Sequence, residues 1–357
     1  MKLHILFKFV EGPYGGGNQF LKALREQLQS QGRYTEVPDH ADAFLWNGYP
    51  FPRYDTVWQL HDTRVKCPSK PIIMRLDGPV WTVRGKDRFY DVLLKRIADV
   101  YVDGIVYQSA WTRDNNKRLT GIAVPFETII YNAPNPAIFN RIGRERWLPS
   151  RKPRLIATSW SANWRKGFRI YQWMDRHLNW DRYEMTFVGN SPIKFANIRM
   201  IPPLPSAELA NILRQHDIYI TASYPDPCSN ALIEALSCGL PAVAYNGGGH
   251  PELVGAGGLL FDRPEHIPQL IERIVSHYDT FQASLPVFDI AAVAEQYHAF
   301  AECISATIAH RRWTSVDVRR LGRHCARLKR YFVFHYTGAR VCEKLREMWR
   351  KTFASGS

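Results

Sequence analysis

Two carboxylates, a helix and a glycine turn follow one another in one short stretch of the chain. Asp226 precedes Glu234 by eight residues, and Glu234 falls in a short predicted helix. The apolar run 241–245 predicts a buried strand, and glycines 247–249 follow it before another helix. Glycine turns and helix N-termini bind phosphate, and carboxylates accept strong hydrogen bonds from hydroxyl groups. The stretch therefore predicts a nucleotide-sugar pocket.

This stretch also resembles the signature of the family 4 retaining glycosyltransferases, the group 1 glycosyltransferases. The matching elements are an acid eight residues before a Glu, then Ala-x-x-Cys-Gly-x-Pro and Gly-Gly-x-x-Glu. The resemblance implies that Glu234 binds the ribose hydroxyls of the donor and that Asp226, where the family usually has Glu, contacts the donor sugar. Gly247 and Gly248 are expected at the donor, where their turn receives either phosphate oxygens or a sugar ring. His250 either touches the donor or begins the next helix.

A second match to the family begins at the predicted strand 155–159 and ends at Lys166. Lys166 is the candidate cation for the donor diphosphate, because the leaving group gains negative charge as the glycosidic bond breaks. The family usually has an Arg about five residues earlier, where this chain has residues 159–161, Ser-Trp-Ser. Arg165 is the candidate substitute for that Arg.

The acceptor side is expected in the first half of the chain. A glycine loop after the first predicted strand resembles the loop at which the family's donor phosphates approach the N-terminal domain. Its residues are Gly15, Gly16 and Gly17. Asp77 ends the predicted strand 71–76, so it either orients the acceptor hydroxyl and accepts its proton or forms a turn before a glycine. His61 is the alternative for this role, or a residue of a surface turn.

Apolar runs alternate with helical patterns along the chain, which predicts two doubly wound parallel sheets. The resemblance implies the α/β GT-B fold, in which two Rossmann-like domains face a cleft. The predicted domains are an acceptor domain at 1–149 and a nucleotide-sugar domain at 150–311, followed by a basic tail at 312–357. The predicted strands are 2–9, 43–47, 56–60, 71–76, 104–108 and 128–131, then 155–159, 185–189, 218–222 and 241–245.

The net charge of +14 is concentrated at the end of the chain. Residues 311–357 hold 13 Lys and Arg against 3 acids, and apolar residues at 321, 325, 328 and 332 recur at helical spacing among them. This pattern predicts a basic amphipathic helix. It either binds an anionic membrane surface, binds nucleic-acid phosphates or packs on the body.

The sequence favours a retaining, metal-independent glycosyltransferase that moves a sugar from a nucleoside diphosphate sugar to a glycan or lipid-linked acceptor. We expect UDP- or GDP-sugar as co-substrate, no other cofactor, and no metal site, because no Asp-x-Asp follows a strand. The alternatives are a GT-B phosphorylase or sugar-nucleotide epimerase, a transferase acting on nucleic acid, and a non-catalytic sugar-binding module. No apolar run has the roughly 20 residues of a membrane span. We expect a cytoplasmic protein, peripheral at the inner face of a membrane if the tail binds lipid.

Overall fold

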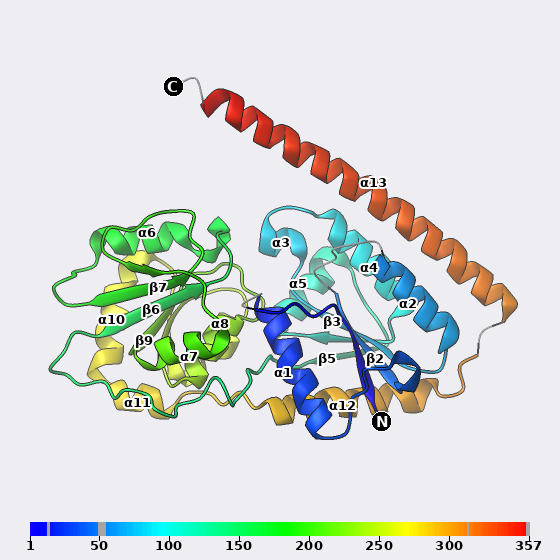
Figure 1. The fold of residues 1–357 in the computed structure, drawn as a ribbon, viewed down its shortest axis with the longest axis horizontal. Coiled ribbons are helices and arrows are strands. Elements are labelled where there is room, and N and C mark those ends of the chain that lie inside the picture. Colours follow the sequence, from blue (N-terminus) through cyan, green and yellow to red (C-terminus); the bar gives the residue numbers. More distant parts are fainter. Residues whose placement is uncertain (13–14, 49–54, 313, 355–357) are drawn as a thin grey trace.

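Two α/β lobes lie side by side, and a long C-terminal helix runs along the outside of the first lobe (Figure 1). The computed structural model describes residues 1–12, 15–48, 55–312 and 314–354. Each lobe is built around one parallel sheet, as the alternation of apolar runs and helical patterns predicts.

The first lobe holds a five-stranded sheet in the order β1-β2-β3-β4-β5. Every neighbouring pair is parallel, and nearly all residues of the first four strands are buried because helices cover both faces. The strands are β1 (Leu3–Leu6), β2 (Ala43–Asn47), β3 (Ile72–Leu76), β4 (Gly104–Tyr107) and β5 (Phe126–Ile129).

Different helices cover the two faces of this sheet. One face packs against α1 and α12, and the other against α2 and α4, with α13 outside these two. The short α3 and the helix α5 follow β3 and β4. The bounds are α1 (Gly16–Ser30), α2 (Asp55–Lys66), α3 (Val80–Arg84), α4 (Phe89–Tyr101), α5 (Ala110–Thr120), α12 (Ile290–Ile308) and α13 (Ser315–Ala354).

The strand predicted at 56–60 is wrong, because this segment is the start of α2. Its β-branched and aromatic residues favour a strand locally, but Val57, Leu60 and Arg64 are buried at intervals of three and four residues. This is the spacing of one helix face, and the burial of that face against the sheet decides the conformation.

The second lobe holds a six-stranded parallel sheet in the order β11-β10-β9-β6-β7-β8. One face packs against α6 and α10, and the other against α7, α8 and α9. The strands are β6 (Arg154–Ser159), β7 (Glu184–Gly189), β8 (Arg199–Ile201), β9 (Ile218–Thr221), β10 (Ala242–Tyr245) and β11 (Gly258–Phe261). The helices are α6 (Phe168–His177), α7 (Ser206–Arg214), α8 (Asn230–Ser237), α9 (His250–Val254), α10 (Ile267–Ser276) and α11 (Tyr278–Ala283).

The chain crosses between the lobes twice. After β5 it runs to β6, and after α11 it returns, so that α12 lies under the first lobe (Figure 1). The buried side of α12, including Ile290, Ala294 and Tyr297, belongs to the core between α1 and the first sheet. The helix α12 falls within the predicted second domain, 150–311, but it packs on the first sheet and so belongs to the first lobe.

The C-terminal helix α13 is amphipathic, as the spacing of its apolar residues predicts. Leu321, Cys325, Leu328 and Phe332 are buried against α2 and α4. In the part of the chain that the structure describes, no helix is both long enough and apolar enough to span a bilayer.

Candidate functional site

A cavity of about 350 Å³ lies between the lobes. The carboxyl ends of β3, β6 and β9 and the N-termini of α1 and α8 border it, which is where ligands bind in open α/β sheets. Most of the predicted site residues line it: Gly15, Gly16, Gly17, Asp77, Arg165, Lys166, Asp226 and Glu234.

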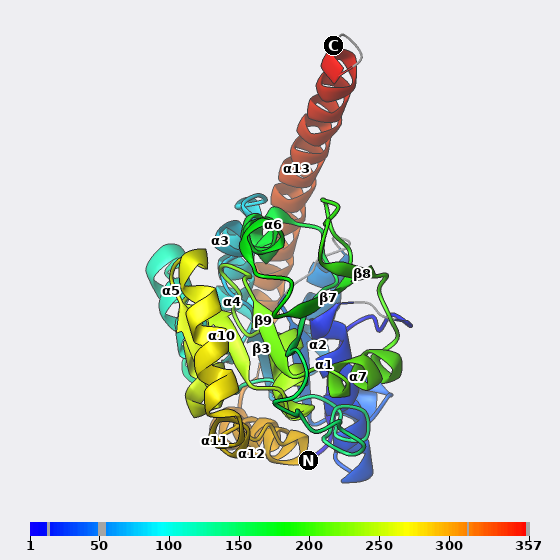
Figure 2. The ribbon, with the colours of Figure 1, turned by 90° about the vertical axis from the view of Figure 1, so that its left-hand side faces the viewer.

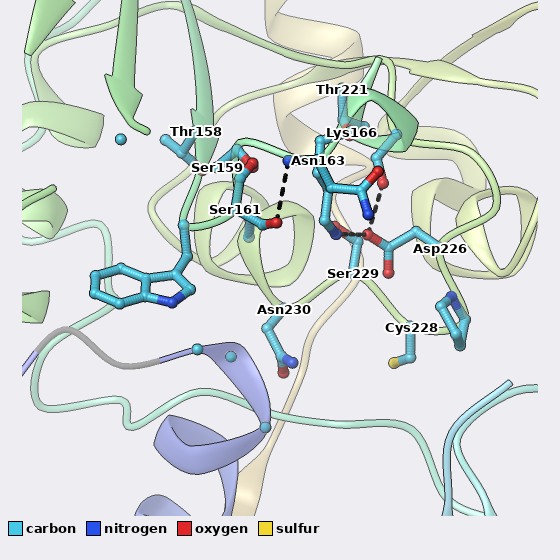
Figure 3. Close-up of a pocket in the computed structure, with 18 of the residues that line it drawn as sticks. Thr158, Ser159, Ser161, Asn163, Lys166, Thr221, Asp226, Cys228, Ser229 and Asn230 are labelled. Atoms are coloured by element: carbon cyan, nitrogen blue, oxygen red, sulfur yellow. Dashed lines mark hydrogen bonds and ion pairs between the residues drawn. The ribbon is translucent and has the colours of Figure 1, made fainter. Parts of the chain in front are cut away.

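Lys166 and Asp226 form an ion pair on the second-lobe wall of the cavity, and Figure 3 shows the two side chains pointing toward one another. The distance from Lys166 Nζ to Asp226 Oδ2 is 2.9 Å, and the Ser223 hydroxyl donates to the same oxygen at 2.8 Å. Burial alone would raise the pKa of Asp226, but the charges of Lys166 and His250 and these two hydrogen bonds lower it below its usual range. Asp226 is therefore an anion at neutral pH.

A close contact between β9 and the loop after β6 fixes the place of Lys166. Gly167, the next residue, has φ of 90°, and a Cβ there would lie 2.3 Å from the Ala222 backbone oxygen. Only glycine lets the chain turn at this point. The backbone of Gly167 thus holds the Lys166 side chain against the loop that carries Asp226.

Glu234 lies on α8 and faces the cavity. Ser229 caps this helix, since its side chain accepts a hydrogen bond from the Leu232 amide. Burial raises the pKa of Glu234 from 4.5 to about 8. No described residue forms an ion pair or a hydrogen bond with this carboxyl group, so it can bind the hydroxyl groups of a ligand.

Asp77 contributes a carboxylate from the first lobe. It follows β3, and its side chain accepts hydrogen bonds from the Gln108 amide and from Arg75, whose Nη1 lies 3.4 Å away. Desolvation raises the pKa of Asp77 and the charge of Asp226 adds to this, against the opposing charges of Arg75 and Arg84. The cavity thus holds two carboxylates, Asp77 and Asp226, with pKa values shifted in opposite directions.

The glycine loop lets the two lobes approach closely. A Cβ at Gly16 would lie 2.6 to 2.9 Å from the side chain of Asn230 at the start of α8, whereas a Cβ at Gly17 would meet nothing within 4 Å. The glycine N-terminus of α1 therefore stands at the cavity directly across from α8.

Arg165 lies in the cavity wall but binds the opposite lobe. Its Nη1 donates to the Thr82 backbone oxygen at 2.8 Å, and its guanidinium packs over Gly85. The predicted phosphate contact of Arg165 stays a prediction. The segment 159–161, where the family is expected to have an Arg, also lines the cavity, and its Trp160 is 44% exposed.

The glycine turn after β10 lies behind the cavity and supports the Asp226 loop. A Cβ at Gly248 would lie 2.3 Å from the Asp226 backbone oxygen, and neither Gly247 nor Gly248 lines the cavity. His250 is fully buried, its Nδ1 lies 3.0 Å from the Tyr245 backbone oxygen, and burial lowers its pKa. Gly248 thus supports the Asp226 loop, and the predicted contacts of Gly247, Gly248 and His250 with the donor stay predictions.

His61 lies away from the cavity. It is buried on α2, with its ring 5.8 Å from that of Trp58 and 6.1 Å from that of Tyr101. The expected acceptor role fails because residues 56–60 are helical, so His61 does not stand at the carboxyl end of a strand.

Glu252 joins the two lobes and was not among the predicted site residues. Its two carboxylate oxygens accept hydrogen bonds from the backbone amides of Ala110 at 2.7 Å and Trp111 at 2.9 Å, and from the Tyr131 hydroxyl at 2.9 Å. A carboxylate at the N-terminus of α5 also complements the helix dipole. The sequence did contain a signal for this residue, because Glu252 is the Glu of the Gly-Gly-x-x-Glu motif.

Among the described residues, no three His, Cys, Asp or Glu side chains are arranged to hold a metal ion. The charged side chains that line the cavity include Asp77, Lys166, Asp226 and Glu234.

Residues 175–279 match the family model for glycosyl transferases group 1. No curated protein matches the chain. Among solved structures, sucrose-phosphate synthase from Thermosynechococcus elongatus is similar with a TM-score of 0.62 and 14% identity, over 86% of this chain and 100% of that one. HepE from Anabaena in complex with UDP-glucose is similar with a TM-score of 0.59 and 13% identity, over 86% and 98%. The catalytic domain of starch synthase IV from Arabidopsis thaliana, bound to ADP and acarbose, gives 0.56 and 13%, over 82% and 79%.

These similarities confirm the predicted fold. The protein has the GT-B fold, and residues 175–279 of its second lobe are similar to the group 1 glycosyltransferases.

Proposed function

We propose that the protein is a retaining, metal-independent glycosyltransferase that moves a sugar from a nucleoside diphosphate sugar to a glycan or lipid-linked acceptor. The observation that carries this proposal is the cavity between the lobes, where the pair Lys166–Asp226 and Glu234 face the glycine N-terminus of α1. The group 1 match over residues 175–279 and the similarity to HepE with UDP-glucose support a nucleotide-sugar donor.

Lys166 stabilises the departing diphosphate in this proposal. Cleavage of the glycosidic bond places negative charge on the leaving phosphate, and a fixed ammonium group lowers the energy of that charge. The backbone N–H groups at the start of α1 face the same cavity from the other lobe and add a second source of positive potential. These groups do the work that a divalent cation does in metal-dependent transferases.

The two second-lobe carboxylates, Asp226 and Glu234, bind the transferred sugar and the ribose of the donor, respectively. Asp226 is anionic and lies beside Lys166, so it contacts hydroxyls of the transferred sugar next to the diphosphate. Glu234 lies further along α8 and binds the ribose hydroxyls. Because the hydroxyls would donate to the ionised form, the nucleotide draws the pKa of Glu234 down from about 8.

Asp77 is the candidate to orient the acceptor, because it lies on the opposite lobe and its pKa is raised. Its hydrogen bonds from Gln108 and Arg75 hold the carboxylate in position. In a retaining reaction without a covalent intermediate, the acceptor oxygen attacks on the leaving-group face. The departing phosphate then takes the acceptor proton, while Asp77 fixes the direction of the hydroxyl.

The test is mass-spectrometric detection of sugar release and transfer across UDP-, GDP-, ADP- and dTDP-sugars, with and without EDTA. Turnover of one donor class that resists EDTA and is lost in Glu234→Gln supports the proposal. The matched control is Glu265→Gln, an exposed glutamate of the second lobe, which should keep full activity. Transfer only to inorganic phosphate would instead show a phosphorylase, and turnover that EDTA abolishes would refute metal independence.

A further inference from the structure

The exposed side of α13 carries a row of arginines. Within residues 319–334 of this 40-residue helix, the buried apolar residues pack against α2 and α4 and the opposite side faces solvent. Five exposed arginines between residues 319 and 330, here named the arginine strip, lie on it: Arg319, Arg320, Arg323, Arg327 and Arg330.

Helical geometry places the strip on one side of α13. Successive residues of an α-helix turn by about 100°, so the five arginines fall within an arc of about 100°. Leu328, on the buried side, lies roughly opposite to Arg323 and Arg330. Within the described part of the chain, no ion pair joins any arginine of the strip to an acid.

An apolar side chain continues the same arc. Phe334 falls between Arg323 and Arg327 in angle, one turn past the end of the strip, and it is 76% exposed. Val333 beside it is 47% exposed. A phenylalanine exposed to this degree next to a row of cations is unusual on a helix that serves only to cover a lobe.

The rest of α13 stands clear of the body. The described contacts with α2 and α4 involve residues up to Tyr336, and Figure 2 shows the C-terminal part of the helix extending away from both lobes. A flat partner can therefore approach the arginine strip and Phe334 together without meeting either lobe.

We propose that α13 binds an anionic lipid bilayer through the arginine strip, with Phe334 inserted at the level of the head groups. The strip supplies the charge complementarity to the lipid phosphates, and the exposed Phe334 and Val333 supply apolar contact. Nucleic-acid phosphates would satisfy the arginines but leave the apolar pair without a role, so the bilayer fits more of the observed surface. The bilayer then lies next to the first lobe, the lobe that carries Asp77.

Co-sedimentation of the full chain with vesicles tests this proposal without any activity measurement. The vesicles are phosphatidylcholine alone, or with about 30% phosphatidylglycerol, at about 0.05 M and about 0.5 M NaCl. We expect binding only to the anionic vesicles, and loss of most of it at the higher salt. Absence of binding to anionic vesicles at the lower salt would overturn the proposal.

Three arginines of the strip are then replaced together, as Arg323→Gln, Arg327→Gln and Arg330→Gln. Each basic residue near an anionic surface contributes about fivefold in binding, so we expect a loss on the order of a hundredfold. The control removes the same charge from exposed positions of the second lobe, as Arg176→Gln, Arg199→Gln and Arg273→Gln. Equal loss in both triple variants would overturn the assignment to α13.

Phe334→Ser separates a bilayer from a nucleic acid. We expect this variant to lose roughly tenfold in binding to anionic vesicles, because burial of a phenylalanine side chain is lost. The control is Ile142→Ser, which replaces an apolar residue that is 81% exposed near the lobe crossing. Unchanged vesicle binding in Phe334→Ser, together with tight strip-dependent binding to a DNA duplex, would overturn the proposal in favour of nucleic acid.

Discussion

Replacing Glu234 by glutamine should make the protein more stable than the wild type at high pH. Burial in the wall of the cavity raises the pKa of this carboxyl group from 4.5 to about 8. Between these values the folded protein holds a proton that the unfolded chain has lost, so the free energy of unfolding of the wild type falls as the pH rises. Glutamine has no such proton, and its amide fills nearly the same space.

The magnitude follows from the two pKa values. At about 1.4 kcal/mol for each pH unit, the rise from 4.5 to about 8 corresponds to a ceiling of about 5 kcal/mol. Glu234 keeps partial contact with solvent in the open cavity, which weakens the desolvation, so we expect about 2 to 3 kcal/mol. The advantage of Glu234→Gln should be small near pH 5, grow up to about pH 8 and stay constant above it.

Urea unfolding of the wild type and of Glu234→Gln at pH 5 and pH 9 measures this difference. The exposed Glu265→Gln serves as control, because its stability relative to the wild type should not depend on pH in this range. The same difference between Glu234→Gln and the wild type at both pH values would refute the reasoning, since it would mean that Glu234 is ionised in the folded protein at little cost.

Three further predictions concern the donor pocket and the contact between the lobes. Lys166→Ala should lower kcat/KM by at least about thirtyfold, or about 2 kcal/mol, because a cation that stabilises the leaving group is lost. Gly16→Ala should cost about 1 to 3 kcal/mol in donor binding, because its Cβ would overlap the Asn230 side chain and push the lobes apart. Glu252→Gln should raise amide exchange at the start of α5, because the charged cap on the Ala110 amide is weakened by about 1 to 2 kcal/mol.

Two of these variants have a matched control, and each of the three has an outcome that would contradict it. Lys194→Ala removes the same charge from an exposed site of the second lobe, and wild-type kinetics in Lys166→Ala would exclude its proposed role. Gly17→Ala adds the same methyl group where no atom lies within 4 Å, so an equal loss of donor affinity in Gly16→Ala and Gly17→Ala, measured by calorimetry, would contradict the overlap argument. For Glu252→Gln, amide hydrogen exchange at the start of α5 is measured by mass spectrometry. Exchange equal to that of the wild type would show that the Glu252 cap contributes nothing to holding the lobes together.

The fold could be predicted because buried parallel strands have a strong local signal. Runs such as 43–47 and 218–221 are apolar except for their last residue, and helices separate them, so their identity does not depend on contacts far away in the sequence. The prediction of a strand at 56–60 is wrong because the conformation of this segment depends on contacts far away in the sequence. Its residues favour a strand, and only the packing of Val57 and Leu60 onto the sheet makes it helical. The placement of α12 on the first lobe is likewise a tertiary effect that no local pattern encodes.

The candidate site could be predicted where a residue touches the cavity directly, and not where it acts through the backbone. Lys166 and Glu234 line the cavity as expected. Gly248 and His250 stand in the same motif but lie behind Asp226, because the turn after β10 packs against the loop after β9. Their spacing in the sequence is compatible with either arrangement, and the close approach of two loops decides between them.

The opposite pKa shifts of Asp77 and Asp226 connect the geometry of the cavity with the different roles that we propose for these two residues. Both carboxylates face one cavity, yet Lys166 and Ser223 hold Asp226 as an anion while desolvation raises the pKa of Asp77. An anion bound to a lysine cannot take a proton readily, which suits a group that only binds sugar hydroxyls. The carboxyl group with the raised pKa, on the other lobe, is the better partner for an acceptor hydroxyl. Neither assignment follows from residue type, because both residues are aspartates, and their surroundings alone distinguish them.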